Sequence, residues 1–370
     1  MGLKRFIKKI YKKLGLATRE ELIDFTNREV AFRTEFLNFY DEFLNYARDT
    51  DKSIFAFKYK MWEFNNYTNI LFYEMYLNNA KKKKDFNPLV SIIIPVYNGS
   101  NYLSCAIDAA LNQTYKNIEV IVVNDGSTDN KKSEKIAKKY GNKIKYYYKD
   151  NGGVSSALNY GIERMNGDYF AWLSHDDFIE KNHIEKLVEL VSCEGNEKVI
   201  PFSSFKVIDT KNNLDIKRTI DAQLVVMDYK MSKLKNYYSL LQGEINGGSV
   251  LIPKEAFEKY GYFDESLRIT QERDMWSRLI KEYHFINVPY DTASLRVHSN
   301  QVTTTAKDVV EKTEKKSLDI INSLTREEIE QLEYNESFFY TKMYHFYNNN
   351  SRTFLAKKMK EKIEKQNSKS

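Results

Sequence analysis

The spacing of hydrophobic and polar positions changes twice along the chain. Up to about residue 85 it is helical, with no internal proline and with long polar side chains between aromatic ones. A charge run and Asn-Pro in KKKKDFNP (81–88) then interrupt the pattern. From Val90 to about residue 303, short apolar runs alternate with helical spacing, and from about residue 307 the sequence is helical and charged again. We therefore expect a helical region at 1–87, a central α/β domain at 88–303 and a helical region with a basic tail at 304–370.

Four apolar runs in the central domain have the continuous hydrophobic character of strands buried on both faces. Helical patterns at 102–113, 133–141 and 154–167 separate them. This alternation predicts a right-handed, parallel α/β sheet. The four runs are VSIIIPVY (90–97), IEVIVVND (118–125), KIKYYYKD (143–150) and DYFAWLS (168–174).

Later segments continue the mixed pattern. Residues 198–209 predict a strand pair or another β element, and 247–265 a strand followed by a helix. Residues 270–283 predict a helix with an acid-rich start, and 296–303 a loop or strand end.

Polar side chains stand at the end of each predicted strand. They are Tyr97, Asp125, Asn151 and the adjacent pair Asp176 and Asp177. In open α/β sheets, ligands bind beyond the carboxyl ends of the strands. One such acid could be a turn former or a helix cap, but four converging strand ends predict a binding site.

The known glycine-rich phosphate motifs are absent from this region. PVYNGSNYL follows the first strand where a dinucleotide fingerprint would stand, and no Walker lysine motif is present. A divalent metal, Mg²⁺ or Mn²⁺, is then the expected means of holding phosphate, with Asp176 as an oxygen ligand. His298 either completes a carboxylate–imidazole site, which suits Mn²⁺ better, or is structural.

Composition limits the class of protein further. The chain has 370 residues and is 42% hydrophobic, enough for one sizeable core. Cys105 and Cys193 show neither metal spacing nor a disulfide framework, so we expect a reducing, cytoplasmic compartment. No apolar run approaches the roughly 20 residues that span a bilayer.

The net charge of +6 is concentrated at the ends of the chain. Residues 1–19 form a basic amphipathic pattern with no acid before Glu20. Such a helix can lie on the inner face of an anionic membrane, or it can dock on its own protein with a solvated basic face; both interpretations stay open. Nucleic-acid binding is not expected, because the lysine runs carry no aromatic platforms.

Several ordered motifs resemble family two glycosyltransferases, which have the GT-A fold. The resemblance covers residues 89 to about 303. It is carried by VSIIIPVYNGSNYLSCAIDAALNQTYKNIEVIVVNDGSTD, NGGVSSALNYGI, GDYFAWLSHDD, GGSVLIPKEAFEKYGYFDE, TQERDMWSRL and RVHSNQVT. It implies a mostly parallel, Rossmann-like sheet flanked by helices, with the two terminal helical regions as extensions.

The resemblance implies a nucleotide site. Pro95 and Tyr97 match the positions where the nucleobase packs, and Asp125 matches the carboxylate that hydrogen-bonds the base, usually uracil. Gly152 and Gly153 match the loop whose backbone approaches the nucleotide. A UDP-sugar is the expected donor.

The metal motif departs from the family pattern. Asp176 matches the last Asp of the family's Asp-x-Asp motif, but Ser174 stands in place of the first. Asp176 is therefore the expected main carboxylate ligand of the metal, with His298 as the late histidine that binds metal or diphosphate. His175 either faces the donor sugar or stacks locally. Asp177 either supports the ligands or caps the following helix.

The remaining motifs imply the catalytic and sugar-binding positions. Glu272 matches the catalytic base, although Gln271-Glu272 replaces the more usual Glu-Asp pair. Gly247 and Gly248 match a stretch lining the donor pocket. Trp276 either forms an apolar face for an acceptor sugar or belongs to the core.

The resemblance thus implies an inverting transferase. Glu272 would take a proton from an acceptor hydroxyl, on a glycan or lipid-linked acceptor of surface polysaccharide synthesis, and metal on Asp176 would balance charge on the diphosphate. Two alternatives remain: a nucleotidyltransferase, disfavoured because PVYNGSNYL lacks a basic residue, and a degenerate binding or scaffold subunit, suggested by Ser174 and the Gln271-Glu272 pair. The helical flanks leave a homo-oligomer open.

Overall fold

A computed structural model of the chain describes residues 82–194, 198–209, 236–298, 301, 308–333 and 335–367, and six positions between 70 and 80. The chain divides into two compact units, 1–82 with 222–229 and 83–221 with 230–370. Nearly all of the first unit lies outside the described residues. The predictions for the basic segment 1–19 and for the helices before residue 82 therefore fall outside them too.

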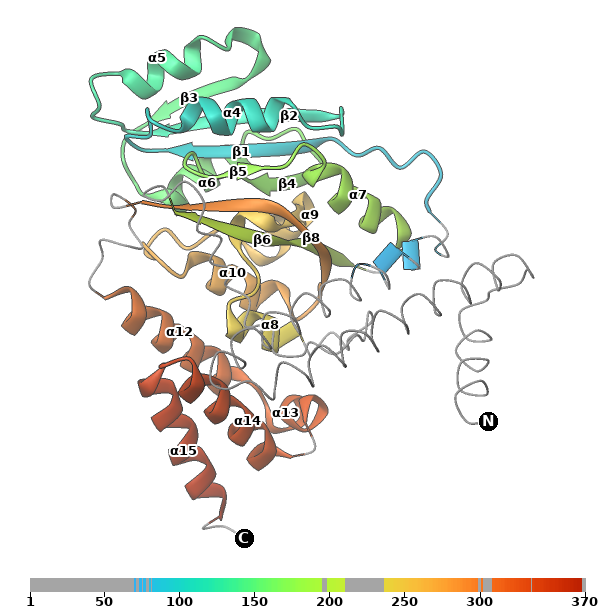
Figure 1. Ribbon diagram of the computed structural model, residues 1–370, viewed down its shortest axis with the longest axis vertical. Coiled ribbons are helices and arrows are strands. Elements are labelled where there is room, and N and C mark those ends of the chain that lie inside the picture. The colour runs from blue at the N-terminus through green and yellow to red at the C-terminus, as the bar shows by residue number, and fades with distance from the viewer. Residues whose placement is uncertain are drawn as a thin grey trace, which may run out of the picture. The chain divides into compact units, whose positions relative to one another are not determined.

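The second unit is built on a five-stranded sheet with the order β3-β2-β1-β4-β7 (Figure 1). The four strands predicted from the sequence run parallel to one another, and β7 is antiparallel to β4. The strands are β1 (Val90–Val96), β2 (Ile118–Asp125), β3 (Lys145–Lys149), β4 (Tyr169–Trp172) and β7 (Leu251–Pro253).

Helices connect the parallel strands as the alternating pattern predicts. They are α4 (Leu103–Leu111), α5 (Lys132–Lys138) with the short turn η1 (Gly141–Lys143), and α6 (Val154–Ile162). Helix α6 packs closely on the sheet, since a Cβ added to Gly161 would lie 2.7 Å from the side chain of Ile93. Because α6 follows the parallel strand β3, its first turn lies at the carboxyl end of the sheet.

A second sheet has the order β5-β8-β6. Its strands are β5 (Phe178–Ile179), β6 (Val199–Asp209) and β8 (His284–Val297), and α7 (His183–Cys193) lies between β5 and β6 in the chain. Residues 198–209, expected as a strand pair or another β element, form the single strand β6, which pairs in parallel with β8. A bridge between Phe202 and Val250 joins the chain beside β7 to this second sheet.

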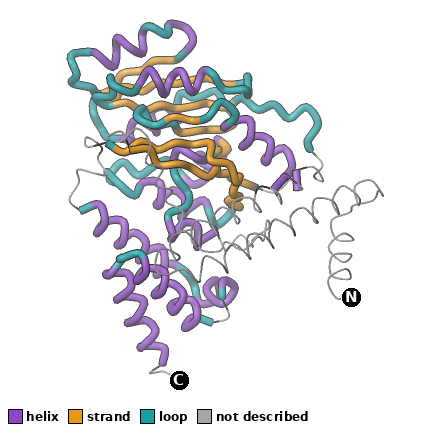
Figure 2. The backbone as a smooth tube through the Cα atoms, viewed as in Figure 1, coloured by secondary structure: helices purple, strands orange, loops and turns teal. Residues whose placement is uncertain are grey.

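The rest of the unit is helical (Figure 2). Residues 308–367 pack into the same hydrophobic core as the sheet, through Ile320, Phe339 and Met343 among others. The fold is therefore a mostly parallel α/β sheet flanked by helices with a helical C-terminal region, as expected. These helices and turns are α8 (Asn236–Gln242), η3 (Gly247–Ser249), α9 (Lys254–Tyr260), α10 (Gln271–Leu279), α12 (Val309–Ser323), α13 (Arg326–Leu332), α14 (Glu336–Asn349) and α15 (Thr353–Asn367).

Candidate active site

The loops after β1 and β2 are tied to each other at the carboxyl edge of the main sheet. The Asn98 side chain donates to Thr128 Oγ1 at 3.2 Å and accepts from the Thr128 amide at 2.7 Å. The Asn98 amide donates to Ser127 Oγ at 2.9 Å. Asn98 has a φ of 52°, in the left-handed region that asparagine tolerates better than most residues. These bonds fix the two loops around a shared edge.

Asp125, at the end of β2, is buried and holds the loop that follows β3. Its Oδ1 accepts from the Gly152 amide at 3.0 Å, and its Oδ2 from the Gly153 amide at 2.8 Å. Lys149 Nζ lies 2.9 Å from Oδ1. The Asn151 side chain donates to the Asp125 carbonyl at 2.9 Å. The residue expected to read the base thus also organises the glycine loop.

Both glycines of this loop are required by the geometry. Gly153 has a φ of 89°, which side-chain-bearing residues rarely adopt. A Cβ on Gly152 would lie 2.7 Å from Ser156 Oγ. Neighbouring side chains therefore approach the backbone of this loop more closely than a Cβ at either position would allow.

Asp176 and His298 meet although 122 residues separate them. Asp176 Oδ2 lies 3.0 Å from His298 Nε2 and accepts from Gln301 Nε2 at 3.1 Å. Burial alone would raise the pKa of Asp176, but neighbouring His175 and the hydrogen bonds from Gln301 and His298 outweigh it and hold that pKa below its ordinary value. The carboxylate is therefore kept ionised.

Asp177 faces a different set of groups. Its Oδ1 accepts from the Arg296 amide of β8 at 2.8 Å. Burial, followed by the nearby Asp176 charge, raises the pKa of Asp177. The capping interpretation is wrong, because Asn182 occupies the N-cap position of the next helix, α7. Asp177 instead ties the metal motif to the second sheet.

Three of the expected site residues lie around the end of β1. Pro95 is buried in the strand, whereas the Tyr97 side chain is 46% exposed and available for stacking. His175 packs against Gly99, where an added Cβ would lie 2.1 Å from the imidazole Cδ2. Burial lowers the pKa of His175. The His175 side chain is half-buried, and whether it also faces a donor sugar stays a prediction.

Sequence reasoning missed a set of residues that complete this edge. Tyr102 stacks at 5.3 Å between ring centroids on His298 and lies 4.7 Å from the Arg296 guanidinium. The strand-end rule that found Asp125 would also have found Lys149, since both end adjacent strands. Nothing in the local sequence signals the others, whose contacts depend on the path of the chain. The missed residues are Tyr102, Lys149, Arg296 and Gln301.

Glu272 stands in the first turn of α10, with one carboxylate oxygen left unpaired by the described residues. The side chain is partly exposed, but its Oε2 is buried and has no hydrogen-bond partner in the described residues. Burial raises the pKa of Glu272. Gln271 Oε1 is likewise buried without a partner. The preceding residue, Thr270, has a φ of 70°, so a β-branched residue is held in the left-handed region just before this pair.

An aromatic chain brings α10 to the end of β4. Trp172 and Phe263 lie 6.1 Å apart between ring centroids, and Phe263 and Trp276 6.3 Å. Trp276 is fully buried and donates to the Ile245 carbonyl at 3.3 Å. The core interpretation of Trp276 is therefore the one that the structure bears out, and Trp276 offers no face to an acceptor.

Gly247 and Gly248 lie in η3 beside the same tryptophan. A Cβ on Gly247 would lie 2.3 Å from the Trp172 ring, whereas one on Gly248 would have no contact closer than 3.3 Å. Gly247 thus lets the chain lie against the end of β4, next to the metal motif.

The donor set suits a hard divalent cation that takes its remaining ligands from substrate. Asp176 and His298 supply one carboxylate and one imidazole, and no cluster of three or more His, Cys, Asp or Glu ligands occurs among the described residues. Mg²⁺ and Mn²⁺ are commonly held by one or two protein groups together with phosphates. Asp176 and His298 therefore fit the metal implied by the resemblance.

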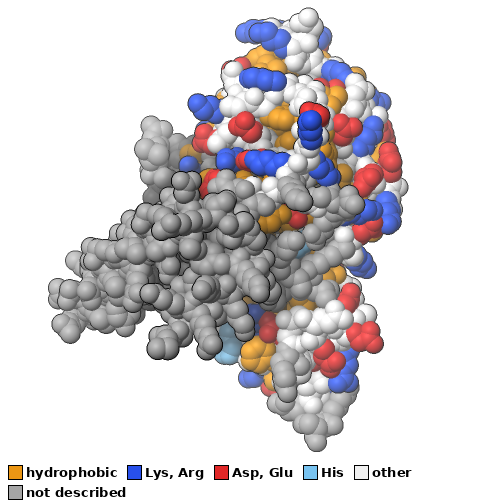
Figure 3. All heavy atoms as spheres, turned by 90° about the vertical axis from the view of Figure 1, so that its right-hand side faces the viewer, with side chains coloured by type: hydrophobic (Ala, Val, Ile, Leu, Met, Phe, Trp, Pro, Cys, Tyr) orange, Lys and Arg blue, Asp and Glu red, His pale blue; other side chains and the backbone are white. Residues whose placement is uncertain are grey.

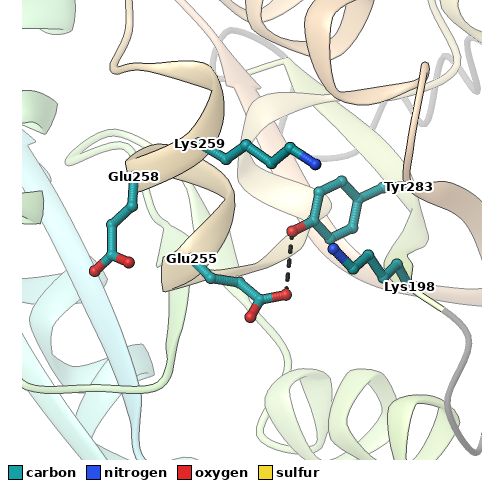
Figure 4. Close-up of a pocket in the computed structure, with 5 residues that line it drawn as sticks. All are labelled: Lys198, Glu255, Glu258, Lys259 and Tyr283. Atoms are coloured by element: carbon teal, nitrogen blue, oxygen red, sulfur yellow. Dashed lines mark hydrogen bonds between the residues drawn. The ribbon is translucent and has the colours of Figure 1, made fainter.

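A pocket of about 330 Å³ lies at the opposite edge of the sheet (Figure 4). Because β7 runs antiparallel to β4, α9 begins near the amino end of β4, away from Asp176. The Tyr283 hydroxyl donates to Glu255 Oε1 at 3.3 Å across the pocket. This pocket is separate from the candidate active site. It is lined by Lys198, Glu255, Glu258, Lys259 and Tyr283.

Basic and acidic side chains alternate over the described part of one face (Figure 3). No helix in the described ranges has both the length and the apolar character to cross a bilayer.

The chain belongs to glycosyltransferase family 2. The profile described as "Glycosyl transferase family 2" matches residues 91–261. An uncharacterized glycosyltransferase of Rickettsia typhi is 44% identical over 254 residues, which cover 67% of this chain and 76% of the relative. Other rickettsial relatives are longer, and the chain spans 43%, 45% and 38% of three of them. A shorter match, 43% identical over 121 residues, is to the minor teichoic acid biosynthesis protein GgaB of Bacillus subtilis, covering 31% of this chain and 13% of that protein.

Solved structures share the fold. Staphylococcus aureus TarS 1–349 in complex with UDP superposes with a TM-score of 0.51 at 16% identity, covering 70% of this chain and 72% of that one. A mannosyltransferase from Pyrobaculum calidifontis, in complex with GDP-Man and Mn²⁺, has a TM-score of 0.51 at 12% identity and covers 80% and 81%. The protein is therefore a family 2 glycosyltransferase with a GT-A-like fold.

Proposed function

We propose that this glycosyltransferase is an inverting, metal-dependent enzyme that moves a sugar from a UDP-sugar to a hydroxyl of a glycan or lipid-linked acceptor in surface polysaccharide synthesis. The observation that carries the proposal is the buried Glu272 Oε2, which has no partner among the described residues and lies on a helix joined through Phe263 to the strand that leads to Asp176. A carboxylate oxygen left without a donor is suited to receive a proton from substrate.

The donor assignment rests on the loop around Asp125. A carboxylate is an acceptor, so it pairs with the imide N–H of uracil. Tyr97 lies exposed at the end of the neighbouring strand, where its ring is available to the base. The TarS complex with UDP supports a uridine nucleotide, and the mannosyltransferase complex with GDP-Man makes GDP-sugars the donor class to test beside it.

Charge on the departing diphosphate must be balanced at the other side of the site. Asp176 and His298 are the residues that would hold a divalent cation, and the cation would supply Lewis-acid stabilisation of the leaving group, worth several kcal/mol. Gln301 and Tyr102 orient these two side chains. Mn²⁺ in the mannosyltransferase complex supports metal use.

The protein's own contribution to the reaction is proton transfer and positioning. Glu272 takes the proton of the acceptor hydroxyl. The acceptor oxygen attacks the anomeric carbon on the face opposite the diphosphate, and the bond from that carbon to the diphosphate oxygen breaks. This single displacement inverts the anomeric centre, and it needs no carboxylate nucleophile of the kind used by retaining enzymes.

The acceptor class rests on two observations of different kinds. GgaB is by its name a teichoic acid biosynthesis protein. The basic segment 1–19 has the pattern of a helix that lies on an anionic membrane surface, where lipid-linked precursors are assembled. We propose a cytoplasmic protein that acts at the inner membrane face.

The test is nucleotide release by the purified chain. Incubation with a panel of UDP- and GDP-sugars, in Mn²⁺, Mg²⁺ or EDTA, is expected to release UDP slowly from one donor, and EDTA is expected to abolish the release. Calorimetry with UDP and Mn²⁺ accompanies it, since an obligatory acceptor would suppress release without suppressing binding. A chain that neither releases nor binds a nucleoside diphosphate would instead be a scaffold subunit.

A further inference from the structure

Arg268 lies beside the glycine loop of the candidate active site, and its side chain has no acidic partner among the described residues. It lies two residues before Thr270, in the loop that leads into α10, and its side chain is exposed. It makes no hydrogen bond or ion pair with the described parts of the chain. Its Nη1 lies 2.7 Å from the position that a Cβ on Gly153 would occupy. The guanidinium therefore lies directly on the glycine loop.

The backbone around Arg268 is held, although its side chain is not. Asn159 of α6 donates to the Phe263 carbonyl at 2.9 Å and accepts from the Phe263 amide at 3.0 Å. Ser155, also on α6, donates to the Leu267 carbonyl at 3.3 Å. The loop is thus anchored to the helix that follows the glycine loop. A cation on an anchored loop, without an acidic partner in the described residues, is positioned to bind an anion from outside the chain.

Lys149 provides the contrast. It lies at the neighbouring glycine, with its Nζ 3.0 Å from a Cβ position on Gly152. Lys149 is neutralised by Asp125 at 2.9 Å, and the two amides of the loop also donate to Asp125. Arg268 is the cation beside this loop that no carboxylate of the described residues balances.

We infer that Arg268 binds the diphosphate of the nucleotide donor. The inference rests on the proposed function and adds a phosphate ligand to the same site. The position favours the donor diphosphate because Arg268 joins the glycine loop, which Asp125 holds, to the helix that carries Glu272. A planar guanidinium grips phosphate oxygens with two parallel hydrogen bonds, which a lysine ammonium does not reproduce.

The experiment compares three variants of the full chain by calorimetry with UDP and uridine in Mn²⁺, and with GDP and guanosine in parallel. Arg268→Ala should weaken UDP binding about tenfold or more and leave uridine binding unchanged, because a charge-assisted hydrogen bond is worth about 1.5–3 kcal/mol. Arg268→Lys should recover part of the loss. Arg326→Ala is the matched control, since Arg326 is an exposed arginine of α13 paired with Glu330, and it should bind UDP like the wild type.

Each other outcome contradicts the inference in a different way. Unchanged UDP affinity in Arg268→Ala overturns it alone. Equal losses for UDP and uridine assign Arg268 to the base or to the fold of the loop. A raised KM for the acceptor with unchanged UDP affinity assigns it to an anionic acceptor. Wild-type protein that binds neither UDP nor GDP overturns the proposed function together with the inference.

Discussion

At the scale of single residues, the buried oxygen of Glu272 has two consequences for the chemistry. It lacks a hydrogen-bond partner among the described residues, and burial raises the pKa of the carboxyl. A base with a raised pKa is stronger once ionised, but it is also protonated over a wider pH range.

Glu272→Gln should lower turnover about 10²–10⁴-fold and leave UDP affinity unchanged, because the amide keeps the shape of the side chain and cannot take a proton. In the wild type, only ionised Glu272 acts as a base. Turnover should therefore fall as pH drops through the raised pKa of Glu272, above the ordinary value of about 4.3 for glutamate. Initial rates of UDP release across pH, with calorimetry of the variant, measure both effects. Turnover by the variant at the wild-type rate would remove Glu272 from the mechanism.

Some site residues were predictable from the sequence, and others were not. Asp125 and Asp176 follow from the rule that polar residues cluster at strand ends, and His298 follows from the family resemblance. Gln301 lies beside Asp176, and Arg268 lies beside Gly153, only because of the folded path of the chain. Trp276 was ambiguous because an aromatic side chain on a helix suits a core as well as a sugar.

At the scale of elements, continuous apolar runs located β1, β2, β3 and β4, since strands buried on both faces have no polar alternation to confuse. Strand β6 was harder. Register shifts at Ser203, Ser204 and Phe205 interrupt its pairing with β8, and the polar pair at that point breaks the hydrophobic pattern. A β-bulge thus made one strand look like two.

The turn η3 offers a matched pair of glycines. Gly247→Ala should destabilise the protein by about 1–3 kcal/mol, because the new methyl would overlap the Trp172 ring. Gly248→Ala should change stability by less than about 1 kcal/mol, since its nearest contact would be 3.3 Å away. Urea unfolding of both variants measures the difference. Equal effects would mean that Trp172 moves freely and that Gly247 is not a packing requirement.

At the scale of the whole second unit, the C-terminal helices belong to the same hydrophobic core as the sheet. Lys316 of α12 lies 2.6 Å from Asp274 of α10, and Arg273 donates to Ser317 at 3.3 Å. Residues of α12, α14 and α15 join the sheet's hydrophobic cluster. The sequence predicted these helices correctly. The change in hydrophobic pattern near residue 303 does not indicate whether they pack on the sheet.

Truncation at residue 303 should therefore give an unstable protein, although the family resemblance ends there. Removing α12–α15 uncovers the core side chains that face Ile320, Phe339 and Met343. Each buried side chain contributes about 1.5–3 kcal/mol of burial free energy, so the loss of several exceeds the free energy of unfolding of a typical domain. Solubility and thermal unfolding of residues 1–303 against the full chain measure this. A truncated protein that melts cooperatively at the full-length temperature would show that these helices form a separate domain.

The left-handed backbone of Thr270 matters for anyone who engineers this enzyme. A β-branched residue in that region costs roughly 1–2 kcal/mol, which glycine would largely avoid. Because Thr270 immediately precedes Gln271 and Glu272, this backbone strain lies at the start of α10, the helix that carries Glu272. Substitutions selected for new donors usually lower the free energy of unfolding, and Thr270→Gly would restore part of it by relieving the left-handed backbone.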